Sequence, residues 1–179
     1  MKLIHTDIKD LYIIEPKVFS DDRGYFFESF SQLQFLNEKL NYTFVQDNEA
    51  KSNYGVIRGL HYQLNDKAQS KLVRVIQGSV LDVVIDIRAN SETYGKVFSI
   101  ELTESNKLQL LIPKGFAHGY SVLSETAIFS YKCDEFYSKD NEGGINLFDA
   151  TLNIDWRIPS SQVIISEKDK LWPNFGKHK

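Results

Sequence analysis

The feature of this sequence that most restricts its fold is a succession of short runs rich in β-branched and aromatic residues, each closed by a turn signal. Such runs are typical of β-strands, whose pleated surface accommodates these side chains. We predict strands over residues 11–14, 25–30, 44–49, 55–63, 71–76, 80–88, 97–102, 108–112, 120–123 and 127–133. Many short strands at regular spacing indicate a β-sandwich or a β-barrel. The sequence therefore predicts a mainly β domain.

The run over residues 80–88 shows the alternation most clearly. Its odd-numbered positions from 81 to 87 are aliphatic and share one face of the predicted strand. The other face carries Asp82, Asp86 and Arg88 beside a valine. The two faces of this predicted strand therefore differ in character, one aliphatic and the other largely charged.

Two segments depart from the strand pattern. Ser31 and Gln34 form a capping box, and leucines then recur at helical spacing, so we predict one short helix over residues 32–40. The tail over residues 153–179 carries apolar side chains that we expect to pack back onto the body, namely Trp156, Ile158, Val163, Ile164, Ile165 and Trp172.

Length and composition limit the number of domains and the kinds of partner that this chain can have. A chain of 179 residues without linkers or repeats fits a single domain over residues 1–179. The formal net charge of -3 gives no basic field for nucleic acid or an anionic membrane, and no run is long and apolar enough to span a bilayer. The N-terminus lacks the apolar core of a signal peptide, and Cys133 is the single cysteine. We therefore expect a cytoplasmic protein without an internal disulfide.

The stretch over residues 55–63 places two costly groups inside an apolar strand. Arg58 is a permanent cation and His61 can exchange a proton near neutral pH, and burying either is unfavourable without a partner. Either they face a ligand, or Arg58 forms a structural ion pair and His61 is a satisfied core histidine. Strict alternation would direct the two side chains to opposite faces. We predict that Gly59 introduces a bulge or bend that lets both reach one cavity.

A histidine that acts as a base needs a partner on its other ring nitrogen. Asp82, Asp86 and Asp169 are candidates for the partner of His61, and the residues alone leave the choice open. Tyr131 lies in an apolar strand, where its hydroxyl needs a partner if it is buried. The alternative is that it is an ordinary core tyrosine.

Cationic residues occur on or beside separate predicted strands. If Arg23, Arg58 and Lys71 converge, they make a site for a phosphate or diphosphate group. The alternative is that each is a solvated surface charge, the usual situation of lysine and arginine.

A metal site is suggested by one motif and opposed by another. Residues 113–118 have the proline, glycine and histidine order of the second cupin motif. The first cupin motif would require two histidines separated by one residue, but here His61 is followed at that spacing by Gln63, a poor ligand for transition metals. We therefore expect a cupin-like barrel without a bound metal.

Motif blocks in a characteristic order extend from residue 14 almost to residue 169. They comprise residues 22–24, 27–29, 44–48, 58–61, 71–74, 112–119, 131–132 and 166–169. In these blocks the chain resembles the dTDP-4-dehydrorhamnose 3,5-epimerase family. The resemblance implies a cupin-type jelly-roll barrel, a homodimer, no metal or other cofactor, and dTDP-4-dehydro-6-deoxy-glucose as the substrate. The product would be the precursor of dTDP-L-rhamnose.

The resemblance also implies roles for individual residues. His61 corresponds to the general base, Asp169 to its carboxylate partner, Tyr131 to the general acid and Lys71 to the group beside the enolate oxygen. The positions that correspond to substrate contacts are Arg23, Glu28, Gln46, Asn48, Arg58, His118, Glu142 and Lys168. In the expected homodimer, the N-terminal strands with Arg23 and Glu28 would help to complete the partner's site.

Two other classes of function remain open. One is a sister enzyme, either a C3-only epimerase or a ketoisomerase acting on the same nucleotide sugar, and the sister epimerase would share all of these residues. A sugar-nucleotide binding module without enzymatic activity would have no need for His61, Tyr131 and Asp169 together. Their joint presence therefore favours an enzyme.

Overall fold

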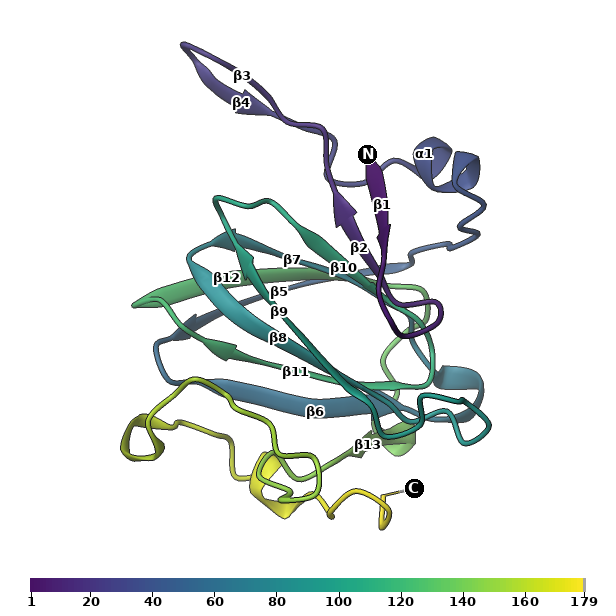
Figure 1. Ribbon diagram of the computed structural model, residues 1–179, viewed down its shortest axis with the longest axis vertical. Coiled ribbons are helices and arrows are strands. Elements are labelled where there is room, and N and C mark those ends of the chain that lie inside the picture. The colour runs from purple at the N-terminus through teal and green to yellow at the C-terminus, as the bar shows by residue number, and fades with distance from the viewer. Residues whose placement is uncertain (179) are drawn as a thin grey trace.

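Two β-sheets face each other in the computed structural model, which describes residues 1–178 (Figure 1). The six-stranded sheet has the order β1 (Lys2–His5), β2 (Tyr12–Glu15), β10 (Gln109–Ile112), β7 (Lys71–Gln77), β12 (Thr126–Cys133) and β5 (Gln46–Asn53). The five-stranded sheet has the order β13 (Glu142–Gly144), β6 (Ile57–Gln63), β11 (Phe116–Val122), β8 (Ser79–Asp86) and β9 (Val97–Thr103). The strands pair antiparallel within both sheets and form a cupin-type jelly-roll barrel, as predicted.

The alternation of β8 explains how the layers are built. Val80 and Val84 point between the two sheets, where they join apolar side chains from β7, β10, β11 and β12. Leu81, Val83 and Ile85 point to the outer face of the five-stranded sheet and pack against the C-terminal tail. Burying these aliphatic side chains on both faces contributes roughly 1.5–3 kcal/mol for each. The strand is therefore a central layer with apolar neighbours on either side.

The C-terminal tail covers the outer face of the five-stranded sheet (Figure 1). Trp156 is buried there, and Val163 and Ile165 pack against the same cluster. Ile164 is itself exposed, but its backbone bonds to that of Gly55 and Ile57 at 2.9 Å and so fastens the tail beside β6. The predicted packing of the tail is confirmed.

Helix α1 (Gln32–Asn37) lies on the outer side of the six-stranded sheet and buries Phe35. The Ser31 hydroxyl accepts from the backbone N–H of Gln34 at 3.5 Å, so the predicted cap is present. The helix ends before the predicted residue 40 because Lys39 adopts a left-handed conformation with φ of 60°. That turn redirects the chain and brings Leu40 into the core.

The strand predicted over residues 25–30 is confirmed only over residues 25–26, and residues 27–30 are not in a strand. The chain instead forms a hairpin of β3 (Phe19–Asp21) and β4 (Gly24–Phe26) that projects away from the barrel (Figure 1). Tyr25 and Phe26 are exposed on this hairpin, at 59% and 66%, whereas Phe30, beyond the hairpin, packs against the cluster around Phe35. The remaining helices are single 3₁₀ turns, namely η1 (Asn65–Lys67), η2 (Lys139–Asn141), η3 (Ser160–Gln162) and η4 (Asp169–Leu171). No helix within residues 1–178 has the length and apolar character needed to cross a lipid bilayer.

Candidate active site

The barrel contains a cavity of about 530 Å³ whose wall is drawn from both sheets and the tail. Its polar lining residues include Arg58, His61, Lys71, His118, Tyr131 and Asp169. A neighbouring hollow of about 320 Å³ shares His61, Lys71 and Tyr131 with the cavity and adds Gln46, Asn48, Gln63 and Glu142. The two spaces are therefore adjacent and share the wall formed by these three residues.

A bulge in β6 brings Arg58 and His61 into the same cavity. His118 pairs with His61 and Tyr120 pairs with Arg58, so two steps along β11 correspond to three along β6. The extra residue shifts the alternation of side chains, and both Arg58 and His61 consequently line the cavity. The predicted effect at Gly59 is confirmed: Gly59 has φ of 142°, and a Cβ there would lie 2.6 Å from the Cα of Gly119.

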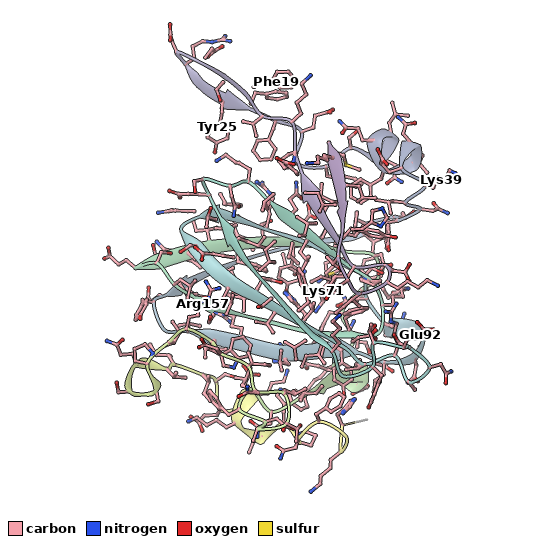
Figure 2. All side chains as sticks on the ribbon, in the orientation of Figure 1. Phe19, Tyr25, Lys39, Lys71, Glu92 and Arg157 are labelled. Carbon is pink, nitrogen blue, oxygen red and sulfur yellow. The ribbon has the colours of Figure 1, made fainter. Side chains whose placement is uncertain are left out.

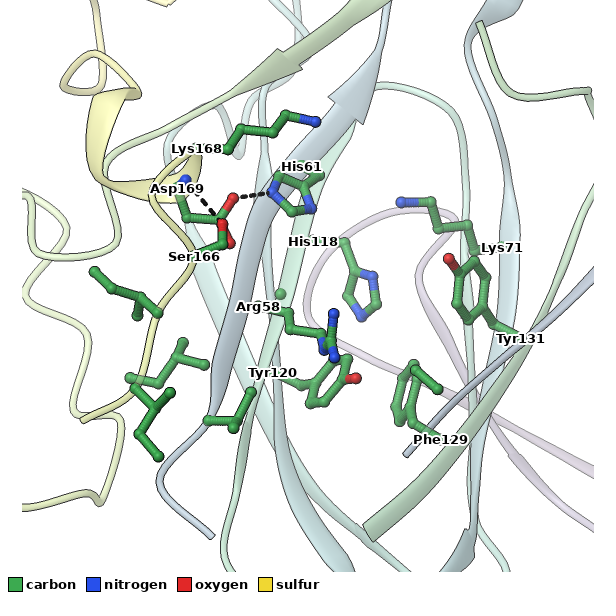
Figure 3. A pocket seen from close by; sticks show the side chains of 16 residues that line it. Arg58, His61, Lys71, His118, Tyr120, Phe129, Tyr131, Ser166, Lys168 and Asp169 are labelled. Carbon is green, nitrogen blue, oxygen red and sulfur yellow. Dashed lines mark hydrogen bonds and ion pairs between the residues drawn. The ribbon is translucent and has the colours of Figure 1, made fainter. Parts of the chain in front are cut away.

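His61 is paired with Asp169, which the tail brings in through η4. Nε2 of His61 lies 2.6 Å from Oδ1 of Asp169 (Figure 3). Burial raises the pKa of Asp169. The hydrogen bond to His61 and the charge of that ring outweigh this effect, so the pKa of Asp169 lies below its ordinary value. The carboxylate stays ionised and accepts the Nε2 proton, which leaves Nδ1 as the basic nitrogen.

The two other candidate aspartates have different partners. Asp82 accepts from Nε2 of His118 at 2.9 Å inside the barrel. Asp86 is bound by Arg88 at 2.7 Å and by the hydroxyls of Ser91 and Thr93. Sequence alone did not choose among the three, because 108 positions separate His61 from Asp169.

Tyr131 lies on β12, in the opposite sheet from His61, and the two face each other across the cavity (Figure 3). Burial is the main cause that raises the pKa of the Tyr131 hydroxyl to about 12. The phenol is therefore protonated at neutral pH and holds a proton on the side of the cavity away from His61.

Lys71 extends from β7 into the middle of the barrel (Figure 2). Burial lowers the pKa of its ammonium, and the charges of Cys133, Asp82 and Glu142 oppose that shift. Burial likewise raises the pKa of Asp82, against the opposing charges of His118 and Lys71. These groups form a buried polar centre at the inner end of the cavity.

The second hollow holds a cluster of paired polar groups. Gln46 donates to Asn48 at 3.1 Å on β5. Across the opening, Lys168 binds Glu142 at 2.5 Å, and the hydroxyl of Tyr137 donates to the same carboxylate at 2.9 Å. Tyr137 was missed by the sequence analysis because it is one exposed aromatic residue in a loop, with no periodic pattern around it.

Arg23 and Glu28 do not join this site within one chain. Arg23 lies on the projecting hairpin, with its side chain 90% exposed and bound to Asp21, and Glu28 binds the side chain of Gln34. Figure 2 shows the hairpin, marked by Phe19 and Tyr25, well away from Lys71. The three cations therefore do not converge within a single chain, in which Arg58 and Lys71 share the cavity and Arg23 is an exposed charge.

Gln63 has a structural role at the position of the second cupin ligand. Its amide donates to the carbonyls of Lys67 and Phe136 at 3.0 and 3.3 Å, and its oxygen accepts from the N–H of Ser138 at 2.6 Å. Both ends of the amide are thus engaged by backbone. Within residues 1–178, no three side chains of histidine, cysteine, aspartate or glutamate are grouped to hold a metal ion.

Comparison with known proteins decides the family. The family model for dTDP-4-dehydrorhamnose 3,5-epimerase matches residues 5–177. The chain belongs to the dTDP-4-dehydrorhamnose 3,5-epimerase family. The dTDP-4-dehydrorhamnose 3,5-epimerase of Shigella flexneri is 51% identical over 172 residues, which cover 94% of this chain and 93% of the relative.

Solved structures of this epimerase family share the whole fold. The crystal structure of the epimerase from Elizabethkingia anophelis is 55% identical, with a TM-score of 0.94 and coverage of 98% of this chain and 97% of that one. The dTDP-6-deoxy-D-glucose-3,5-epimerase from Legionella pneumophila, solved in complex with dTDP-4-keto-L-rhamnose, is 45% identical, with a TM-score of 0.93 and coverage of 98% and 93%. The resemblance inferred from the motif blocks is confirmed.

Proposed function

We propose that the chain inverts C3 and C5 of dTDP-4-dehydro-6-deoxy-glucose and so produces dTDP-4-dehydro-L-rhamnose. The observation that carries this proposal is the position of His61 and Tyr131 on opposite sheets, facing each other across one cavity. Membership of the epimerase family supports the choice of substrate. Epimerisation requires a proton to leave one face of the sugar and another to arrive from the opposite face, which this pair of groups can accomplish.

The reaction depends on the C4 ketone of the substrate. A hydrogen on C3 or C5 becomes acidic only if the resulting enolate is stabilised. The Lys71 ammonium inside the barrel is suited to bind the enolate oxygen. One donor preorganised in this way contributes about 10²–10³ in rate.

His61 is the proposed general base. Nε2 is held by Asp169 at 2.6 Å, so Nδ1 is the nitrogen that would take the proton. Asp169 orients the ring and stabilises the imidazolium that forms. A positioned base contributes roughly 10²–10⁴ in rate.

Tyr131 is the proposed general acid. Its hydroxyl remains protonated at neutral pH because burial raises its pKa to about 12. It would deliver its proton to the face of the enolate opposite His61 and recover one from solvent. Inversion then follows from the geometry, and the same pair can serve each carbon beside the ketone in turn.

The nucleotide part of the substrate supplies binding energy for positioning. We propose that Arg58 and Lys168 contact its charged groups, while the polar side chains around the two hollows bind the remainder. These contacts are assigned to Gln46, Asn48, His118 and Glu142. Holding the diphosphate leaves the ketone beside Lys71.

A homodimer is also part of the proposal. Phe19, Tyr25 and Phe26 expose apolar surface on the projecting hairpin. A hairpin that reaches a second copy would cover this surface and bring Arg23 and Glu28 to the partner's cavity, which neither approaches in its own chain. The dTDP-sugar substrate and the single, buried cysteine fit a cytoplasmic enzyme.

We propose that the chemistry needs no metal or other cofactor, because Lys71 is placed to stabilise the enolate by itself. Gln63, whose amide is engaged by backbone, supports this proposal. Activity should survive exhaustive chelation. Loss of activity with EDTA that a divalent ion restores would contradict it.

Proton NMR of the product formed in heavy water tests the function. Incubation with dTDP-4-dehydro-6-deoxy-glucose should place deuterium at both C3 and C5. Deuterium at C3 alone would identify a C3-only epimerase. Movement of the ketone to another carbon would identify a ketoisomerase.

A further inference from the structure

Trp172 makes a contact with the His61–Asp169 pair that the mechanism above does not use. Its indole Nε1–H donates to Oδ1 of Asp169 at 3.3 Å, the same oxygen that His61 bonds at 2.6 Å. The ring of Trp172 also lies edge-on to that of His61, with the centroids 6.2 Å apart. One carboxylate oxygen therefore carries two donors, one from the strand and one from the tail.

Gly144 makes room for this contact. It is the residue of β13 that pairs directly with His61 on β6. A Cβ at Gly144 would lie 2.4 Å from atoms of the Trp172 ring, so the indole occupies the space that a side chain would fill. The indole thus lies against the backbone of the strand next to His61 and reaches Asp169 from there.

The segment that follows Trp172 is fastened to the body. The carbonyl of Pro173 accepts from the N–H of Asn146 at 2.8 Å, and the N–H of Phe175 donates to Asp149 at 2.6 Å. The indole is therefore held between Gly144 on one side and an anchored chain on the other. This arrangement restricts where the N–H can point.

We propose that Trp172 is a positioning residue that fixes the orientation of the Asp169 carboxylate and sets the proton affinity of the His61–Asp169 pair. The inference rests on the proposed function in one respect, because it takes His61 as the base. Trp172 is not among the described residues that line the cavity or the neighbouring hollow. In this proposal it therefore acts through Asp169 and does not touch the substrate.

The indole N–H acts in two ways. It donates a hydrogen bond to Oδ1 of Asp169. This bond hinders rotation of the carboxylate and keeps Oδ1 directed at Nε2 of His61. It also disperses part of the negative charge that would otherwise stabilise a protonated imidazole. Without it, the pair should bind its proton more tightly, and the titration midpoint, which belongs to the pair as a whole, should rise.

Other charged or titratable groups face this pair from every neighbouring element. They are Arg58 on β6, Glu142 on β13, Lys71 on β7, His118 on β11, Tyr131 on β12 and Lys168 in the tail. All of them are unchanged in the variants described below. A difference between those variants therefore reports on the indole.

The first test is the pH profile of Trp172→Phe, which keeps the ring and removes the N–H. The acid limb of kcat/KM should move up by about half a pH unit, the equivalent of one modest hydrogen bond. kcat should fall about threefold to tenfold while KM stays the same. If Trp172 matters only for folding, the variant should contain less active enzyme, and the midpoint of the acid limb of kcat/KM should equal that of the wild type. That result would overturn the inference.

The chain offers a matched control. It has two tryptophans, and the indole of Trp156 donates to the carbonyl of Leu147 at 2.8 Å, away from the cavity. Trp156→Phe removes an equivalent N–H and should lower the free energy of unfolding without moving the midpoint of the acid limb of kcat/KM. A midpoint that moves equally in both variants would overturn the inference.

A second measurement needs no substrate. With ¹⁵N-labelled tryptophan, the indole resonance of Trp172 should shift with pH at the midpoint of the His61–Asp169 pair, whereas that of Trp156 should not. Gly144→Ala, which displaces the indole, should remove this shift and raise the kcat/KM midpoint as Trp172→Phe does. A Trp172 resonance independent of pH would overturn the inference. Absence of epimerase activity would instead refute the proposed function and leave this coupling measurable.

Discussion

His61 and His118 are paired directly across β6 and β11, yet they bond different carboxylates. His61 bonds Asp169 in the tail, at the cavity wall, whereas His118 bonds Asp82 in the barrel interior. Two similar histidine–aspartate pairs thus lie side by side. Only the pair that includes His61 has its carboxylate supplied from outside the barrel.

The role of the first pair can be tested with substitutions of both members. His61→Ala should abolish deuterium exchange at C3 and C5, because no proton leaves without the base. Asp169→Asn keeps the shape of the side chain and removes the charge, so kcat should fall by about 10²–10⁴. Exchange is measured by proton NMR in heavy water. Normal double epimerisation by His61→Ala would overturn the assignment.

Tyr131→Phe should separate proton removal from proton return. His61 can still abstract the proton, but the opposite face then lacks its donor. Deuterium should enter with retained configuration at one or both carbons, while the yield of inverted product falls by about 10²–10⁴. Full inversion at the wild-type rate would assign the donor to another residue.

The hairpin proposal can be tested by mixing subunits. Arg23→Ala should weaken the site that its hairpin completes, and His61→Ala inactivates its own site. In a dimer of one variant with the other, exchange of hairpins restores one complete site. Refolding an equal mixture makes about half of the dimers mixed, so about a quarter of the wild-type activity should return. If each hairpin serves its own chain, or if light scattering shows an active monomer, the mixture should gain nothing.

Gly59→Ala should damage both stability and the site. The left-handed φ of 142° and a Cβ placed 2.6 Å from the Cα of Gly119 leave no room for the methyl group. We expect a loss of about 1–3 kcal/mol in the free energy of unfolding, measured by chemical denaturation. Gly24→Ala shares the positive φ but has no atom within 4 Å of the new methyl group, so a smaller loss is expected in this control. Equal losses in the two variants would show that the clash with Gly119 has no effect.

Asp86 should make stability depend on pH under acid conditions. Its burial raises the pKa, but hydrogen bonds from Arg88, Ser91 and Thr93 outweigh this effect and lower it to about 2. The folded value lies below the unfolded one, so the stabilisation is complete above about pH 4 and is lost as the pH falls towards 2. The loss is on the order of 2 kcal/mol. Denaturation curves between pH 7 and 2 should show a shallower decline in Asp86→Asn, which starts from lower stability.

Residue patterns within one segment of the sequence were enough to predict the features of the fold that depend on that segment alone. The alternation around Asp82 correctly identified the two faces of β8, and the conflict between Arg58 and His61 correctly indicated an irregularity at Gly59. By contrast, the leucine spacing overestimated the length of α1. Leu33 and Leu36 are exposed, at 68% and 50%, because Phe35 supplies the buried contact of the helix, and Leu40 is buried only beyond the end of the helix.

The sequence alone could not predict contacts between site residues that the tail and the loops bring together from distant parts of the chain. No local pattern links Asp169 to His61, so the choice of partner depended on family resemblance before the structure provided it. Trp172 looked like an ordinary apolar residue, and its contact with Asp169 depends on the space above Gly144. Arg23 could not be placed either, because its hairpin projects away from the barrel.

The position of Asp169 after β13, the last strand, has a consequence for biosynthesis. A ribosome releases the chain from its N-terminus, at roughly 5–20 residues per second, so every barrel strand emerges before this carboxylate does. A nascent chain can therefore close its barrel around the cavity while His61 still lacks its partner. His61 gains its carboxylate partner only when the segment that carries η4 settles against β6.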